Sequence, residues 1–203
     1  MRLIFATHNP DKVAELRHAL ADLPIELLSA ADYPQLSAVE ETGTTLAENA
    51  LLKARSVHAA TGEAALADDT GLEVDALGGA PGVHSARYAG PDADYEHNLA
   101  KLLREMEGVP RERRTARFRT VIAIILPDGP EHLATGVCEG RILSVRRGSG
   151  GFGYDPVFLV PAAERTFSEM TLAEKGRISH RGRAVRAARR FLEARLADRD
   201  SSA

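Results

Sequence analysis

Residues 67–88, ADDTGLEVDALGGAPGVHSARY, place two adjacent carboxylates, Asp68 and Asp69, between an apolar run and a glycine-rich turn. Short apolar runs at residues 64–67 and 72–74 predict two strands that flank the pair. In open α/β proteins the end of a strand delivers its side chains to the sheet edge, where binding sites form. The pair is therefore a candidate for holding Mg²⁺ on a phosphate, and a plain acidic turn without chemistry is the alternative.

Alternating strand and helix patterns on both sides of this stretch predict an α/β fold, with helices flanking a mixed, strongly twisted sheet. The other predicted strands are residues 2–6, 25–28, 115–126, 132–138 and 141–145, of which 115–126 and 132–138 form an antiparallel hairpin. Apolar residues at helical spacing predict helices that carry residues 13–20, 46–57, 95–106 and 184–192. A capping box at Thr45 and Glu48 marks the start of the second helix, and Ser179 caps the last.

The length and composition of the chain indicate one globular domain. Its 203 residues are 44% apolar and 27% charged, which argues against a disordered chain and against a membrane protein. We expect residues 1–197 to form a single two-lobed domain and residues 198–203 to be a frayed tail. The longest apolar run, residues 121–126, is far shorter than the about 20 residues that a bilayer requires, and no amino-terminal signal follows Met1.

The cysteine content and the net charge narrow the function classes further. Cys138 is the single cysteine, which excludes an intrachain disulfide and a cysteine-based zinc site and makes the cytoplasm the expected location. The net charge of −3 gives no general attraction to nucleic acid, so we expect no stable nucleic-acid complex and no membrane association. Residues 177–199 are locally rich in arginine, which on a helix is most often a solvated face.

Polar residues follow the first predicted strand. Thr7, Asn9 and Lys12 lie before the first predicted helix, where backbone N–H groups and the positive end of the helix favour anions. A hydroxyl, an amide and an ammonium group at this place form a candidate triphosphate grip, although the P-loop pattern is absent. The alternative is a common Asn-Pro-Asp turn before a helix.

Two further acidic residues, Glu40 and Glu41, precede the capped helix. With the aspartate pair they offer four carboxylates, of which Mg²⁺ needs one or two, because water and phosphate oxygens supply its other ligands. Which of the four reaches the metal stays open from the residues alone; Glu40, Glu41 and Asp69 are the candidate Mg²⁺ ligands, and a surplus carboxylate could act as a base. For Glu40 and Glu41 the alternative is a solvated acidic loop.

Residues 149–156, SGGFGYDP, combine two aromatic side chains and an acid with a flexible, glycine-rich backbone. An aromatic ring on such a loop is suited to stacking on a nucleobase. Lys175, His180 and Arg181 follow and can all donate hydrogen bonds, which select a purine 6-oxo group and penalise a 6-amino group. For His180 and Arg181 the alternative is a helix start with exposed polar residues.

These motifs occur in the order phosphate grip, acidic site, aromatic loop and donor set, and together they closely resemble the inosine triphosphate pyrophosphatase family. The resemblance is carried by THNPDK (7–12), EETGTTLAENALLKA (40–54), ADDTGLEVDALGGAPGVHSARYAG (67–90), GGFGYDPVF (150–158) and KGRISHRGRA (175–184). Members of that family hydrolyse deaminated purine nucleoside triphosphates, ITP, dITP and XTP, to a monophosphate and pyrophosphate. The match covers nearly the whole chain.

The resemblance implies a two-lobed α/β fold with a central cleft, a homodimer, and Asp69 as the catalytic and Mg²⁺-binding residue. The substrate-binding residues that it implies are Thr7, His8, Asn9, Pro10, Asp11 and Lys12 for the triphosphate, Thr70, and Phe152, Gly153, Tyr154, Asp155, Lys175, His180 and Arg181 for the purine. His8 stands where a glycine is frequent in the family, and Thr70 where a serine is. Both keep the needed backbone or hydroxyl group.

We therefore expect a Mg²⁺-dependent hydrolase in which a water attacks the α-phosphorus and pyrophosphate leaves. Mg²⁺ would neutralise phosphate charge, Lys12 would stabilise the departing oxygens, and Asp69 would bind the metal or orient the water. One alternative is a related house-cleaning pyrophosphatase for other modified nucleotides. Another is a non-catalytic nucleotide- or nucleic-acid-binding module that uses Phe152 and the arginine-rich helix. Both fit the acidic residues poorly.

Overall fold

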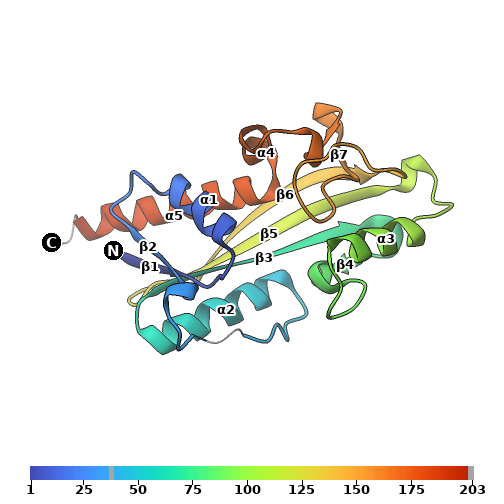
Figure 1. Ribbon diagram of the computed structural model, residues 1–203. Helices are drawn as coiled ribbons and strands as arrows, with labels where there is room; N and C mark the ends of the chain where they lie inside the picture. The colour runs from blue at the N-terminus through green and yellow to red at the C-terminus, as the bar shows by residue number, and fades with distance from the viewer. Residues whose placement is uncertain (37–38, 201–203) are drawn as a thin grey trace. The chain divides into compact units, whose positions relative to one another are not determined.

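The computed structural model describes residues 1–36 and 39–200, except for the side chains at positions 11, 199 and 200 (Figure 1). The helices are α1 (Pro10–Ala19), α2 (Leu46–Thr61), α3 (Tyr95–Glu105), α4 (Leu172–Ile178) and α5 (His180–Asp200). The strands are β1 (Arg2–Phe5), β2 (Glu26–Ser29), β3 (Ala64–Val74), β4 (Pro81–Gly82), β5 (Thr115–Ile125), β6 (His132–Ile142), β7 (Phe158–Val160) and β8 (Arg165–Thr166). No helix in these described ranges is long and apolar enough to cross a membrane.

The strands form one sheet in the order β2-β1-β3-β5-β6-β7-β8, with β4 paired to β3. β1 is parallel to β2 and to β3, whereas β4, β7 and β8 each pair antiparallel with a neighbour. The predicted α/β fold with a mixed sheet is therefore confirmed. β5 and β6 are neighbours joined by residues 126–131, as the predicted hairpin requires.

The aspartate pair lies inside a strand, which corrects the prediction of two short strands on either side of it. β3 is continuous over eleven residues, and the Thr70 hydroxyl lies 2.7 Å from that of Thr120 on the neighbouring β5. The extended backbone therefore does not stop at the pair. β1, however, pairs with β3 only as far as Leu66, so Asp68 and Asp69 come just beyond the carboxyl end of β1. It is β1, and not β3, that ends beside these carboxylates.

The chain divides into two compact units. Unit 1 comprises Met1–Asp69, Val121–Thr135 and Ala184–Ala203, and unit 2 comprises Thr70–Thr120 and Gly136–Arg183. β3, β5 and β6 each contribute residues to both units. The chain therefore passes from unit 1 to unit 2 in the middle of β3, directly after the aspartate pair.

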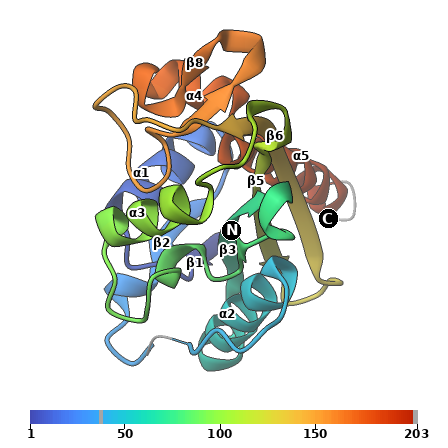
Figure 2. The ribbon, with the colours of Figure 1, turned by 90° about the vertical axis from the view of Figure 1, so that its right-hand side faces the viewer.

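Unit 1 is layered because its strand residues alternate between two faces. Leu3 and Phe5 of β1 join a core with Leu16 of α1 and Leu192 of α5. Ile4, which points to the opposite face, joins a separate core with Val57 of α2. Within unit 1, α1 and α5 thus cover one face of the strands and α2 covers the other (Figures 1 and 2).

Unit 2 has its own core, built from α3 and the unit's parts of the long strands. Leu99 and Leu102 of α3 belong to this core together with Leu72 of β3. The Phe118 ring of β5 lies 4.7 Å from the Phe158 ring of β7, centroid to centroid. These contacts fix the strands that carry the aromatic loop, residues 149–156, and the segments after it.

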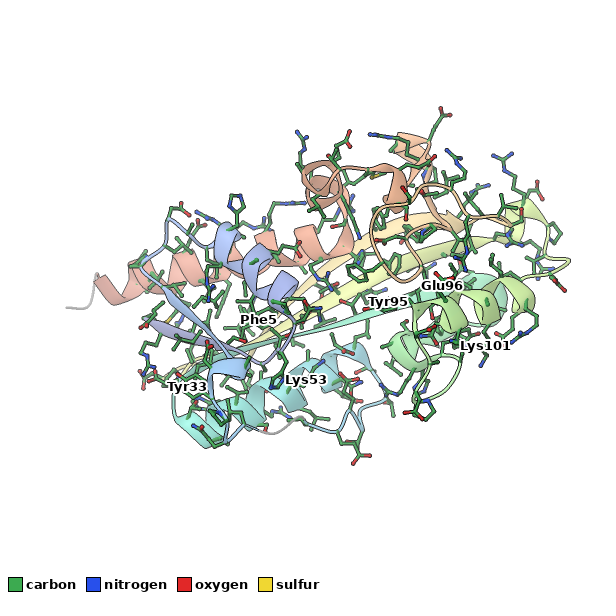
Figure 3. All side chains as sticks on the ribbon, in the orientation of Figure 1. Phe5, Tyr33, Lys53, Tyr95, Glu96 and Lys101 are labelled. Carbon is green, nitrogen blue, oxygen red and sulfur yellow. The ribbon has the colours of Figure 1, made fainter. Side chains whose placement is uncertain are left out.

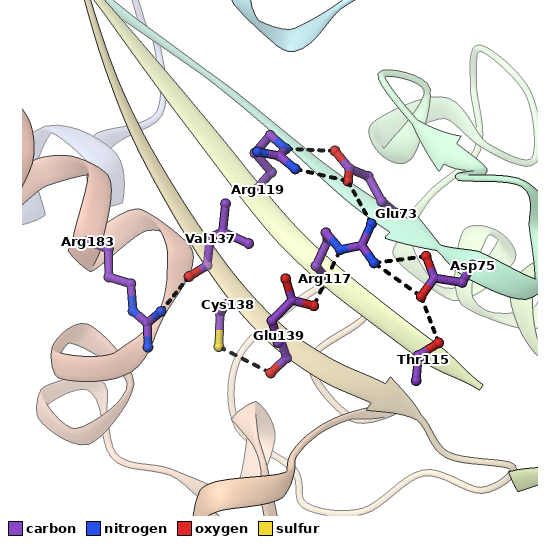
Figure 4. A network of polar contacts seen from close by, with 9 residues as sticks. All are labelled: Glu73, Asp75, Thr115, Arg117, Arg119, Val137, Cys138, Glu139 and Arg183. Atoms are coloured by element: carbon purple, nitrogen blue, oxygen red, sulfur yellow. Dashed lines mark hydrogen bonds and ion pairs between the residues drawn. The ribbon is translucent and has the colours of Figure 1, made fainter. Parts of the chain in front are cut away.

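One face of unit 2 carries a ladder of charges (Figure 4). Arg117 and Arg119 of β5 alternate along the strand with buried residues, as the two-residue period of a strand dictates. Arg119 pairs with Glu73 at 2.8 Å, and Arg117 pairs with Asp75 at 2.9 Å and with Glu139 at 3.3 Å. Partly exposed ion pairs of this kind contribute about 0–1 kcal/mol each, so the ladder adds little to the free energy of unfolding.

The carboxy-terminal half of unit 2 contains a helix that the sequence analysis did not predict. α4 begins after Thr171, whose side chain accepts a hydrogen bond from the Glu174 backbone in a capping box. α5 then begins directly after Ser179, as predicted, and runs to Asp200. Residues 198–200 of the expected frayed tail are thus helical, and residues 201–203 lie outside the described residues.

Candidate active site

The loop after β1 is held by its own polar side chains. The Ser29 hydroxyl of β2 donates a hydrogen bond to the Thr7 carbonyl, and the Thr7 hydroxyl accepts one from the Asn9 backbone N–H. The Asn9 side chain accepts one from the Lys12 backbone in the first turn of α1, and Pro10 opens that helix. The loop therefore places its hydroxyl, amide and ammonium groups at a helix N-terminus, where anions are favoured. His8 is exposed, and the side chain of Asp11 lies outside the described residues.

The cation of this loop contacts the first carboxylate of the aspartate pair. Lys12 Nζ lies 2.8 Å from Asp68 Oδ1, and Asp68 is buried. The sequence assigns Lys12 to the phosphates and Asp68 to the carboxylates, but it does not predict that the two pair. In unit 1 the structure thus joins the phosphate loop to the acidic strand.

A second lysine, Lys53 of α2 (labelled in Figure 3), contacts two more of the four carboxylates. Its Nζ lies 2.8 Å from Glu41 Oε1 and 2.9 Å from Asp69 Oδ1. Burial disfavours the charged Lys53, but the carboxylates of Asp69 and Glu41 more than compensate and leave its pKa raised. Burial raises the pKa of Asp69, an effect that Lys53 only partly offsets. Asp69 therefore holds its proton more readily than an exposed aspartate does.

Lys53 is the residue of this group that sequence reasoning missed. It lies within the quoted motif EETGTTLAENALLKA, two helical turns after the capping residue Thr45. Its position on the helix does not distinguish a lysine of the site from a solvent-exposed lysine. The signal that could have found it is the surplus of carboxylates, since partly buried acids require a cation nearby.

The carboxylates around Lys53 in unit 1 could hold a divalent metal ion. Asp69 Oδ2 is buried and lacks a hydrogen-bond partner among the described residues, so one carboxylate oxygen is available to a ligand. Glu41 is half-buried, whereas Glu40 is exposed. In the described part of the chain no three His, Cys, Asp or Glu side chains are grouped as a metal cage. One or two carboxylates suffice for Mg²⁺, because it keeps several waters and binds phosphate oxygens.

A buried amide fixes the segment that carries Glu41. Asn49 of α2 is fully buried, and its Oδ1 accepts a hydrogen bond from the Gly43 backbone at 2.8 Å. A Cβ at Gly43 would lie 2.6 Å from that oxygen and 2.7 Å from the Glu48 Cβ. Gly43 is therefore needed for close approach of the acidic segment to α2.

Gly43→Ala is expected to lower the melting temperature. Relieving the overlap with Asn49 costs about 1–3 kcal/mol, which in a chain of this size is a fall of about 2–10 °C. Gly176→Ala is the matched control, because nothing lies within 4 Å of a Cβ there. Alanine in this helix should raise the melting temperature by about 2–4 °C. Thermal unfolding of both variants checks this, and an unchanged value for Gly43→Ala would contradict the role of the close approach.

In unit 2 the aromatic loop is held by one carboxylate. The buried Asp155 accepts a hydrogen bond from the Phe152 backbone at 3.0 Å and pairs with Lys175 Nζ at 2.5 Å. Gly151 has a φ of 74°, and a Cβ at this residue would overlap the Asp155 carboxylate. Asp155 therefore links the loop to α4.

The Phe152 ring itself is half exposed and lies among cations. Lys175 Nζ lies 5.0 Å and the Arg181 guanidinium 6.0 Å from its centroid. Tyr154, by contrast, is buried and donates its hydroxyl to the Ser85 carbonyl at 2.9 Å. The loop thus presents one ring beside two hydrogen-bond donors and is anchored by the other ring.

The remaining predicted substrate-binding residues, His180 and Thr70, lie in different surroundings. His180 is buried and stacks on Phe118 at 4.5 Å, so it is not the exposed helix start of the alternative interpretation. Thr70 is half-buried and contacts Thr120. Unit 2 thus brings Phe152, Asp155, Lys175 and Arg181 together, and unit 1 brings Lys12, Glu41, Lys53 and the aspartate pair together.

Comparisons with known proteins cover nearly the whole chain. Residues 3–191 match the sequence model of the Ham1 family. The chain is 52% identical to a protein from Desulforamulus reducens named dITP/XTP pyrophosphatase, over 95% of this chain and 96% of that protein. It is 54% identical to a protein of the same name from Thermus thermophilus, over 92% of this chain and 89% of that protein. The solved structure of a HAM1 protein from Coxiella burnetii superposes with a TM-score of 0.91 at 40% identity, over 96% of this chain and 99% of that chain.

Proposed function

Because the chain belongs to the Ham1 family, we propose that it hydrolyses deaminated purine nucleoside triphosphates, dITP, ITP and XTP, to the monophosphate and pyrophosphate. The observation that carries the proposal is the group around Asp69 in unit 1, where a buried carboxylate oxygen is left without a hydrogen-bond partner while the other oxygen pairs with Lys53, and the adjacent Asp68 pairs with Lys12. This combination suits phosphoryl chemistry, in which positioning and charge stabilisation provide most of the catalysis. It also agrees with the names of relatives that are about half identical to this chain.

The residues of unit 1 are assigned to the phosphates and the attacking water. Lys12, with the loop residues Thr7 to Asp11, binds the triphosphate and stabilises the departing pyrophosphate oxygens. Lys53 holds Oδ1 of Asp69, which leaves Oδ2 either to bind Mg²⁺ or to orient the water that attacks the α-phosphorus.

Glu40, Glu41 and Asp69 are the carboxylates that would hold Mg²⁺, as proposed from their chemistry. When bound, Mg²⁺ supplies positive charge that offsets the charge of the phosphates. The residues of unit 2 are assigned to the purine: Phe152 stacks on the base, and Lys175 and Arg181 donate to its 6-oxo group. Thr70, His180 and the loop residues Gly153 to Asp155 complete the proposed substrate set.

We also propose a homodimer that works in the cytoplasm, with residues 1–197 as one functional domain. These proposals rest on the family resemblance and on the single cysteine. Size-exclusion chromatography with light scattering tests the dimer, and a monomeric mass at micromolar concentration would contradict it.

The direct test of the function is pyrophosphate release from ITP, XTP, GTP, ATP and dUTP, with and without Mg²⁺. We expect rapid release from ITP and XTP only when Mg²⁺ is present. Preference for dUTP would favour a related house-cleaning enzyme. Salt-sensitive binding to DNA or RNA without pyrophosphate release would favour a binding module.

Glu41→Gln is expected to raise the Mg²⁺ concentration needed for half-maximal activity by about 10- to 100-fold, since one charged ligand contact is worth about 1.5–3 kcal/mol. Glu40→Gln is the matched comparison, and we expect a smaller change because its side chain is exposed. Mg²⁺ titrations of the two variants and the parent provide the measurement. Identical titrations for all three would assign both glutamates to a solvated loop.

A further inference from the structure

Two exposed aromatic rings lie side by side in unit 2. Tyr95, the first residue of α3, is 52% exposed and Phe152 of the aromatic loop is 50% exposed, yet their ring centroids are 5.7 Å apart. Figure 3 labels Tyr95 and its neighbour Glu96 at the start of α3. A ring pair at this distance lies within the attractive range for aromatic contacts. Tyr95 belongs to neither the purine motifs nor the core of unit 2.

The start of α3 is a rigid base for the Tyr95 ring. Asp94 caps the helix and accepts a hydrogen bond from the His97 backbone at 2.9 Å. One turn later the buried Asn98 accepts a hydrogen bond from the Ala89 backbone at 2.7 Å and donates one to the Ala86 carbonyl at 3.0 Å. Both the oxygen and the nitrogen of the Asn98 amide therefore bind the segment before α3, and these two hydrogen bonds fix the first turn of the helix.

The loop that carries Phe152 is held through its backbone and its other side chains, but not through the Phe152 ring. Phe152 stands between Gly151 and Gly153, both with positive φ, and glycine is the residue with the most backbone freedom. The Asp155 carboxylate holds the Phe152 backbone but not its ring. The ring is held from outside, by Lys175 over it and by Tyr95 beside it. An ion pair between Glu96 and Arg146 at 2.6 Å joins the same turn of α3 to the beginning of the loop region.

We infer that Tyr95 is a positioning residue for the purine: it holds the Phe152 ring in the orientation that stacks on the base. This inference rests on the proposed function, because it assumes that Phe152 binds a purine. Tyr95 lowers the cost of substrate binding by pre-ordering an exposed ring that the loop itself does not anchor, which is how preorganisation increases affinity. It acts through Phe152 and not by touching the substrate. Its loss therefore raises KM and leaves kcat nearly unchanged.

The first experiment is steady-state pyrophosphate release from ITP by three variants. Tyr95→Ala is expected to raise KM about two- to tenfold, the range of an aromatic pair, with kcat within about twofold of the parent. Tyr95→Phe keeps the ring and should restore the parent KM. Val145→Ala removes another exposed hydrophobic side chain of unit 2 and is the control. If Tyr95→Ala unfolds, Tyr95→Leu retains bulk and helix propensity and still lacks the ring.

A double-mutant cycle with Phe152→Ala decides the mechanism. If Tyr95 acts through Phe152, Tyr95→Ala has no further effect on KM once Phe152 is alanine. An equal increase in KM with and without the Phe152 ring would overturn the inference. So would a Tyr95→Ala variant with the parent KM. A parent enzyme that releases no pyrophosphate from ITP would instead refute the proposed function, so the two failures are distinguishable.

Discussion

Asp69→Asn is expected to lower kcat for pyrophosphate release from ITP by about 100- to 10,000-fold, the range for loss of a general acid–base group. The change keeps the shape of the side chain and removes the charge that orients water or binds Mg²⁺. Lys53 keeps its second partner, Glu41, so no buried cation is left unpaired. Burial already disfavours the charged form of Asp69, which is why its pKa is raised and why a neutral amide is tolerated. Thermal unfolding should therefore show a folded protein.

The matched control for this prediction is Asp75→Asn. Asp75 directly follows the last residue of β3 and is paired with Arg117 on the charged ladder of unit 2 (Figure 4). The same chemical change at this place should leave kcat within about twofold of the parent, since exposed pairs contribute little. Turnover by Asp69→Asn within a few-fold of the parent would remove Asp69 from the mechanism.

Arg181→Ala is expected to reduce kcat/KM for ITP by about 10- to 100-fold and to leave the already low value for ATP almost unchanged. A charged hydrogen bond to the 6-oxo group is worth about 1.5–3 kcal/mol, and a 6-amino group cannot accept it. The values for the two substrates should therefore converge. The measurement is kcat/KM for ITP and ATP with parent and variant. A proportional loss on both substrates would place Arg181 with the phosphates or with the fold.

Two other variants test whether the effect on the ratio of ITP to ATP is specific to Arg181. Phe152→Ala should lower kcat/KM for both substrates, because stacking is largely indifferent to base identity and is worth about 1–3 kcal/mol. Arg183→Ala removes a neighbouring arginine that is exposed and donates to the Val137 carbonyl at 2.8 Å (Figure 4). It should leave the ratio of ITP to ATP unchanged. A changed ratio for Phe152→Ala would mean that the ring also reads the base.

Local signals in the sequence predicted most of the elements correctly. The capping box of Thr45 and Glu48 and the cap at Ser179 place the starts of α2 and α5, because these contacts are made by residues three or fewer positions apart. The same kind of signal at Thr171 marks α4, which was overlooked. The break predicted at the aspartate pair was wrong, because turn-forming residue types do not show that a neighbouring strand pairs with them.

The ion pairs of the candidate site could not be derived from the sequence. Lys12 and Asp68 are 56 positions apart, and Lys53 and Asp69 are 16 apart. Which lysine meets which aspartate depends on strand register, since neighbouring residues of a strand point to opposite faces. Composition indicated that acids and cations belong together, but the partners are determined only when α1, α2 and β3 have taken their places in the fold.

The division of the chain into two units restricts how such a protein can be recombined. The chain passes between units 1 and 2 at four junctions, between residues 69 and 70, 120 and 121, 135 and 136, and 183 and 184. The residues assigned to the phosphates all lie at or before Asp69 and those assigned to the base at or after Phe152, so a single genetic crossover between these positions exchanges one group without the other. Such a crossover nevertheless divides unit 2, because its core combines residues from both sides of the cut, such as Leu72 and Phe158. Transplanting unit 2 intact would require all four junctions at once, so new base preferences are more accessible through individual substitutions in unit 2 than through exchange of the whole unit.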